Sequence, residues 1–239
     1  MKHLVSFALS LLLAASLHTA QAQKENQETV EGNGRMVTKE ITVQPFTSLE
    51  ASGVYELKLT QGSKEGVTIE ADENLQPYFA VHNEGNKLVI DTKALHNKNL
   101  HTQNKMRVSV TFKSLQSLDL KTVGNVSSTN DLSFGNLDMN NKSVGNVDLN
   151  LNANSLNLEN TSVGNVTLNG KAENAVVRNS GVGSLKAGNF VVQTLDIDNT
   201  GIGGAEVNAA KGLKVKDSFL GKVKNKGAAP MRKMNKVVI

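Results

Sequence analysis

Two outward aspartates in a repeated block come nearest to a catalytic pair in this sequence. Asp119 and Asp138 each follow the first leucine of a block, and the two blocks begin nineteen residues apart. On adjacent parallel strands, such carboxylates would lie about 4.8 Å apart and could share a proton. Paired acids on the outer face of a β-helix would suit an enzyme that cleaves polysaccharide.

The residues around this pair favour a structural role instead. The same column continues with Asn157, and the next outward column alternates in sign from block to block: Glu159, Arg178, Asp198 and Lys216. Opposite charges on neighbouring strands stabilise their pairing. We therefore expect Asp119 and Asp138 to belong to charge ladders. The sequence predicts no catalytic residue, and the protein is expected not to be an enzyme.

The histidines and cysteines predict neither a metal site nor a cofactor site. His96 and His101 share a polar loop, but they are five residues apart with no acid between them, which is no recognised ligand spacing, and His82 stands alone. The chain has no cysteine, which excludes disulfides, thiolate ligands and a cysteine nucleophile. It also has no tryptophan and only two tyrosines, so sugar rings would find few aromatic platforms.

The elements that would position these side chains are repeats of about nineteen residues. Within one copy, Leu137, Met139, Val147 and Leu149 alternate with polar residues, which is typical of strands with one buried face. A fixed period of this length predicts one solenoid coil per copy. The copies begin at Leu118, Leu137, Leu156, Ala175, Leu195 and Leu213, with a truncated copy at Met231.

This period predicts an all-β, right-handed parallel β-helix, or β-solenoid, with a less regular β-rich N-terminal part. A left-handed β-helix has hexapeptide repeats, and the step of seven from Leu137 to Val144 breaks that pattern. Parallel crossovers are also right-handed in nearly all known cases.

Asparagine and glycine recur at fixed places in the copies. The fifth position forms a column whose amides are expected to hydrogen-bond from coil to coil. A shorter column, Asn125, Asn146 and Asn165, follows a glycine, and asparagine tolerates the left-handed backbone that a corner needs. Because these amides recur in every coil, a structural role is favoured over ligand binding. The first column is Asn141, Asn160, Asn179, Asn199, Asp217 and Asn235, and the glycines are residues 124, 145, 164, 183, 203 and 221.

The chain is expected to form one domain over residues 35–239, with irregular β coils over 35–117 and regular repeats over 118–239. Residues 23–34 are predicted to be a flexible leader. Asp72 is expected to cap one helical turn, and residues 93–105 read as a polar loop. In the irregular part, alternation predicts strands at 41–43, 55–59, 67–71, 88–90 and 106–112.

Residues 1–22 read as a secretory signal peptide. A basic start precedes an apolar run, and Ala20-Gln21-Ala22 is a cleavage site, so the mature chain would begin at Gln23. No later segment is long enough to cross a membrane. Without a lipid-carrying cysteine, the product is expected to be periplasmic, outer-surface or secreted in a Gram-negative bacterium.

The net charge of +4 is too small to predict nucleic-acid binding, but the C-terminus is strongly basic. From Lys211 onward there are nine lysines or arginines and one acid, Asp217. These cations could bind acidic polysaccharide or lipid headgroups. They could also keep the exposed last strand from pairing with another molecule, and this second interpretation is favoured.

The sequence resembles the putative auto-transporter adhesin, head GIN domain family. The resemblance is carried by residues 46–55 (FTSLEASGVY), 70–75 (EADENL), 86–90 (NKLVI) and the strand Val108–Val110, and it covers about residues 34–227. It departs from that family in using Val-Gly-Asn turns where Gly-Ser-Gly is frequent. The resemblance implies a right-handed β-helical fold and export, and it implies no catalytic residues.

Three functions follow as hypotheses. The first is a non-enzymatic, adhesin-like solenoid that presents a binding surface to an envelope or host polysaccharide or protein. The second is a protein that binds or degrades polysaccharide through the Asp119 and Asp138 face. The third is a structural envelope element that self-assembles, since solenoid ends can stack into a homo-oligomer.

Overall fold

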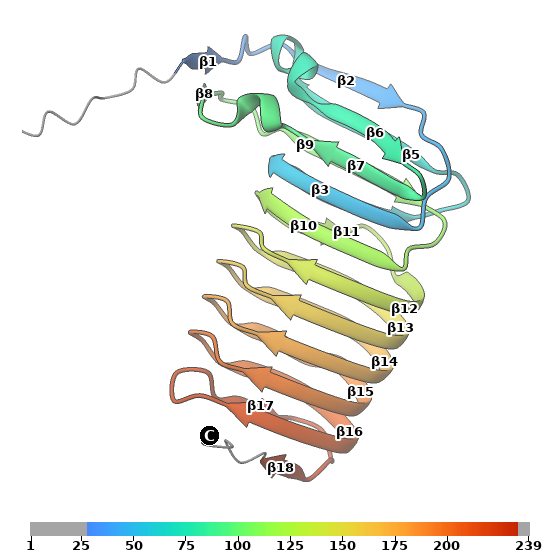
Figure 1. The fold of residues 1–239 in the computed structure, drawn as a ribbon, viewed down its shortest axis with the longest axis vertical. Helices are drawn as coiled ribbons and strands as arrows, with labels where there is room; N and C mark the ends of the chain where they lie inside the picture. Colours follow the sequence, from blue (N-terminus) through green and yellow to red (C-terminus); the bar gives the residue numbers. More distant parts are fainter. Residues whose placement is uncertain (1–27, 234–239) are drawn as a thin grey trace, which may run out of the picture.

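The computed structural model describes residues 28–233 (Figure 1). The predicted signal peptide, the mature start at Gln23 and Asn235 of the asparagine column lie outside the described residues. Strands are stacked from one end of the molecule to the other, and those of the repeats are parallel. No helix within residues 28–233 has the length and apolar character needed to span a membrane.

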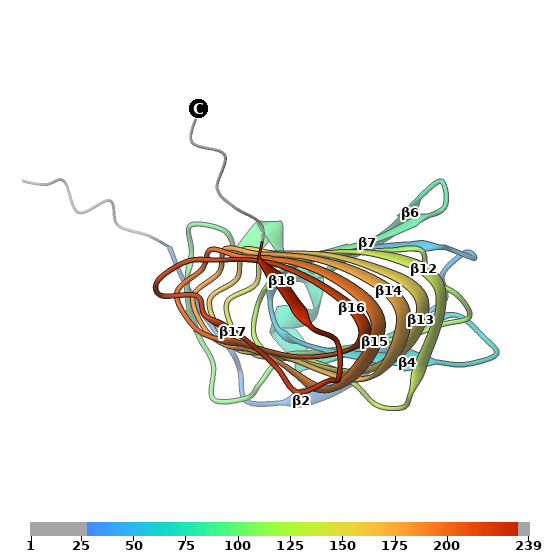
Figure 2. The ribbon, with the colours of Figure 1, turned by 90° about the horizontal axis from the view of Figure 1, so that it is seen from below.

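The repeats form the coils predicted from the period. In register, Leu137 lies beside Leu156, which lies beside Ala175, and all three side chains are buried. Figure 2 looks along the stack and shows the coils lying over one another. The right-handed parallel β-helix is confirmed. Its strands are β10 (Ser117–Val123), β11 (Val126–Ser128), β12 (Leu132–Asn141), β13 (Val147–Asn160), β14 (Val166–Asn179), β15 (Leu185–Asn199), β16 (Ala205–Asp217), β17 (Val223–Asn225) and β18 (Met231–Lys233).

The register predicted between the first two copies is wrong by two residues. Leu118 pairs with Met139 rather than with Leu137. A shift of two keeps every side chain on its face, so alternation alone cannot detect it. The corner sets the true register, because Val123 pairs with Val144 and the backbone of Gly145 packs against the carbonyl of Gly124.

The N-terminal part caps the stack with antiparallel strands. Leu49 and Leu118 pair in register, as do Leu57 and Val126, so the buried core continues from this part into the repeats. Two short 3-10 helices, η1 (Glu73–Tyr78) and η2 (Lys93–Leu95), lie at this end. The strands are β1 (Thr29–Glu31), β2 (Met36–Ile41), β3 (Ser48–Val54), β4 (Glu56–Gln61), β5 (Gly66–Asp72), β6 (Ala80–Glu84), β7 (Lys87–Asp91), β8 (Asn99–His101) and β9 (Arg107–Phe112), with β2–β5, β5–β9 and β6–β7 antiparallel.

Several expectations for this part need correction. The stretch predicted to be a flexible leader contains β1, which pairs with β8 inside the predicted polar loop and buries Val30. The strand predicted at 41–43 ends at Ile41. Asp72 does precede a helical turn, but its carboxylate makes no capping bond and instead accepts hydrogen bonds from Asn104 and Thr102.

Candidate functional site

Asp119 and Asp138 do not form a pair. In register, Asp119 lies between Glu50 and Asn140, whereas Asp138 lies between Ser117 and Asn157. The predicted juxtaposition followed from the register error of two residues. Asp138 instead accepts a hydrogen bond from the Asn157 amide at 3.1 Å, as the ladder interpretation expects.

Glu50 lies in register beside Asp119, and its carboxylate is stabilised in the charged form. Lys121 Nζ lies 2.7 Å from Asp119 Oδ2 and 3.2 Å from Glu50 Oε1, and Lys87 lies 3.3 Å from Glu50. Burial favours protonation of Glu50, but the two lysines outweigh it and lower its pKa. The hydrogen bond to Asp119 raises the pKa of Lys121. These shifts favour the charged forms of Glu50 and Lys121, which suits a charge ladder rather than proton transfer.

The three histidines within residues 28–233 are dispersed and exposed. His82 lies 3.2 Å from Glu84, while His96 follows η2 and His101 ends β8. Within residues 28–233, no three histidine, cysteine or acidic side chains are grouped closely enough to hold a metal ion.

The predicted asparagine column is a buried, directional ladder. Asn141 donates to Asn160 at 2.8 Å, Asn160 to Asn179 at 2.6 Å, and Asn179 to Asn199 at 2.5 Å. The last amide donates to the carbonyl of Gly221 at 2.7 Å. Asp217 continues the register but has no amide to donate. The column is therefore part of the interior and offers no face to a ligand.

The second asparagine column has a different role from the one predicted. Asn125, Asn146 and Asn165 each accept a backbone N–H from the next coil at 3.0 Å. None of the three has a positive φ; the preceding glycines do, at 138° for Gly145 and 139° for Gly164. Glycine thus makes the corner, and asparagine ties it to its neighbour.

An exposed aliphatic ridge runs along the same corner. Each coil contributes one side chain to it, in register with the next, and each is 40–60% exposed. The repeat pattern gives both valines of Val-Gly-Asn-Val equal weight, but Val144 is exposed while Val147 is buried. This exposed surface is therefore not predicted by the repeat pattern. The ridge is Val54, Val123, Val144, Val163, Val182, Ile202 and Leu220.

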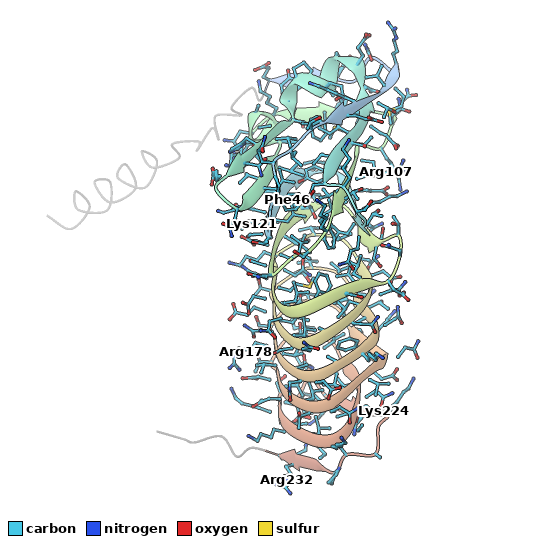
Figure 3. All side chains as sticks on the ribbon, turned by 90° about the vertical axis from the view of Figure 1, so that its right-hand side faces the viewer. Phe46, Arg107, Lys121, Arg178, Lys224 and Arg232 are labelled. Carbon is cyan, nitrogen blue, oxygen red and sulfur yellow. The ribbon has the colours of Figure 1, made fainter. Side chains whose placement is uncertain are left out.

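A groove of about 410 Å³ opens on the outer face of the last coils. Its charged lining residues are Lys211, Lys214, Arg232 and Asp196, so cations outnumber acids three to one. Figure 3 shows Arg232 at the C-terminal end of the stack, with Arg178 and Lys224 on opposite sides. This basic groove thus contains three of the nine lysines and arginines that make the C-terminal sequence basic.

These features define a parallel β-solenoid whose outward residues form ladders, a ridge and a basic groove. The chain belongs to the putative auto-transporter adhesin, head GIN domain family, whose model matches residues 45–229. The resemblance stated from the sequence is thereby confirmed. No curated protein matches the chain.

Solved structures of similar fold come from Bacteroides and Parabacteroides species. A putative adhesin from Bacteroides fragilis is 26% identical with a TM-score of 0.72, over 86% of this chain and 100% of that one. A putative lipid binding protein from Parabacteroides distasonis is 18% identical with a TM-score of 0.61, over 87% of this chain and 100% of that one. A putative adhesin from Parabacteroides merdae is 24% identical with a TM-score of 0.55, with the same coverage. The last two show similarity of fold alone.

Proposed function

We propose that this protein is an exported, non-enzymatic β-solenoid that presents an adhesin-like binding surface. The observation that carries the proposal is the outer face around Asp119 and Asp138. There Asp119 and its in-register neighbour Glu50 are bridged by Lys121, and Asp138 accepts a hydrogen bond from Asn157. The acids are thus engaged in a ladder rather than free for glycoside cleavage. Membership of an adhesin family and the similarity to the Bacteroides fragilis protein support the same role.

Self-assembly is the second candidate, and the aliphatic ridge favours it. Contiguous exposed apolar surface marks contact sites in soluble proteins. The side chains from Val123 to Ile202 follow one another in register at the strand spacing, so two ridges could pack against each other along their length. The partner in this case would be a second copy of the chain. Sedimentation of the mature protein over a wide concentration range tests this directly.

Binding and cleavage should be measured together on the mature protein, residues 23–239. We expect labelled protein to bind cell-envelope fractions or arrayed glycans, and to release no reducing ends from the same glycans. Cleavage that disappears in an Asp119→Asn, Asp138→Asn double variant would overturn the non-enzymatic assignment. Failure to bind any envelope fraction would overturn the adhesin-like role.

Export is tested by mass spectrometry of the protein from its native host. The expected product begins at Gln23 and carries no lipid, because Ala20-Gln21-Ala22 is the predicted cleavage site and the chain has no cysteine. An intact Met1 or a lipid adduct would contradict this localisation.

A further inference from the structure

We infer that the basic groove binds a segment of acidic polysaccharide through its carboxylate or sulfate groups. This inference rests on the proposed function and names the ligand class for one surface of the solenoid. Four observations carry it: the shape of the groove, its uncompensated charge, the stacking of like charges within it, and the position of its lysines away from the sheet edge.

The groove follows one outward column of the last coils. Asn174, Thr194 and Gly212 follow one another in register, and Pro230 lines the groove beside them. Gly212 has no side chain, and the methyl group of Thr194 lies 2.8 Å from the position that its Cβ would take. The walls combine polar groups with the apolar surfaces of Val176 and Pro230. A concave site with apolar walls and few polar groups is the usual form of a ligand pocket.

Asp196 is the one acid among the described residues that line the groove, in register with Lys214, but it lies beyond ion-pair distance of the three cations, whereas other cations of the last coils are paired. Lys216 lies 2.6 Å from Asp198, and Lys226 lies 2.7 Å from Glu206. Over residues 28–233, Lys211, Lys214 and Arg232 make no ion pair, and all three are exposed. The groove therefore carries excess positive charge that an anion would neutralise.

Two of these cations are also direct neighbours. Lys214 and Arg232 occupy paired positions on β16 and β18, and both point outward from the sheet. Like charges directly opposite each other on adjacent strands destabilise the pairing. An anion bound between them would remove this repulsion, so the arrangement is better suited to the bound state than to the free one.

Protection of the sheet edge does not account for all of this charge. β16 is covered by β15 on one side and by β17 and β18 on the other, so Lys214 does not lie on an edge strand. Its side chain rises from the face of the sheet and cannot shield backbone groups at the edge. Arg232, on β18, is in a position to do so, and the two roles are compatible for that residue.

The ligand class follows from the lining. Among the described residues that line the groove there is no aromatic side chain, so a neutral sugar would lack a stacking platform, and charge must supply the affinity. Thr194 donates to Asn174 Oδ1 at 2.5 Å, and the amide nitrogen of Asn174 stays available to a sugar hydroxyl. The cations surround a hollow rather than a raised surface, which favours a flexible polymer over a flat membrane.

The test measures binding of an oligogalacturonate, a uronic acid oligomer, to the mature protein by calorimetry. We expect binding that weakens as salt rises, no binding of maltohexaose, and no retention on phosphatidylglycerol vesicles. A Lys214→Gln, Arg232→Gln double variant should lose about tenfold or more in affinity. Asp196→Asn, which removes the one acid of the groove, should gain roughly two- to fivefold.

The control is Lys142→Gln, which removes an exposed lysine four coils away and should change affinity by less than about twofold. Thermal melts verify that each variant is folded. Equal binding of maltohexaose, an equal loss in Lys142→Gln, weaker binding in Asp196→Asn, or retention on vesicles alone would each overturn the inference. If the double variant still binds envelope fractions like the parent, the groove assignment fails while the adhesin-like role stands.

Discussion

Asn160 and Asn179 are nineteen residues apart in the chain, yet their side-chain amides are joined by a hydrogen bond of 2.6 Å inside the solenoid. Both residues are almost completely buried. Asn160 Oδ1 in turn accepts from Asn141 and from the hydroxyl of Ser162. Each amide is thus satisfied only when its neighbours one coil up and one coil down are in register.

Replacing Asn160 with alanine should therefore destabilise the protein by about 1–3 kcal/mol, since it leaves buried partners unsatisfied on both sides. The matched control is Asn157→Ala, which removes an exposed amide with a single bond to Asp138 and should cost about 0.5 kcal/mol or less. Urea unfolding of both variants gives the comparison. If Asn160→Ala unfolds like the parent but abolishes binding to a ligand, the column is a recognition surface after all.

The inward and outward assignment of β13 predicts opposite results for two neighbouring positions. Leu158→Asp would place an unpaired charge in the core and should cost several kcal/mol. Glu159→Gln, on the exposed face, should cost at most about 1 kcal/mol. Thermal melts distinguish the two, and similar losses would contradict the register of this strand.

Glycine at the corner is expected to be irreplaceable. Gly164 has a φ of 139°, and a Cβ there would lie 2.1 Å from the carbonyl oxygen of Gly145. Gly164→Ala should therefore cost at least about 1–3 kcal/mol. Gly135→Ala is the control, because no atom lies within 4 Å of its Cβ position, and it should be neutral or slightly stabilising. Chemical denaturation would refute the corner geometry if both variants behaved alike.

Asp72 should make stability sensitive to acid. The hydrogen bond from Asn104 lowers its pKa despite burial, and Thr102 adds to the effect. Because the folded pKa lies below the unfolded value of about 3.9, this contribution is complete above about pH 5 and is lost as pH falls through the folded value. Asp72→Asn should be less stable than the parent at pH 7, and the difference should shrink below pH 4. Urea unfolding at both pH values tests this, and a constant difference would exclude the linkage.

The regular half of the fold was predictable because every coil has the same alternation of inward apolar and outward polar residues. The positions of Leu156 and Asn160 are buried in successive coils and pair with the same positions of the neighbouring coils. The period of the sequence therefore predicts both the core and the buried asparagine ladder. Between the first two copies, however, Leu118-Asp-Leu and Leu137-Asp-Met look alike, although the coil has gained two residues. The similar strand sequences suggest a register in which Leu118 pairs with Leu137. The glycine corner fixes a different register, because the backbone contact there permits only one alignment.

The surfaces were harder to predict than the core. Val144 and Val147 are the same residue type three positions apart, and only the corner between them decides which is exposed. The basic groove depends on which lysines find acids, and Lys214 and Lys216 differ in this respect although both face outward. The cap was partly missed because β1 and β8 are short polar strands with little alternation.

The backbone hydrogen bonds between coils all lie along the axis of the stack, which has a mechanical consequence. A pull between the two ends would load these bonds in series and detach one coil at a time, rather than shear many rows together. Each detached coil of about nineteen residues would release roughly 60 Å of extended chain. A protein tethered at one end and attached to a surface at the other would thus yield in steps, lengthening while its remaining coils stay folded.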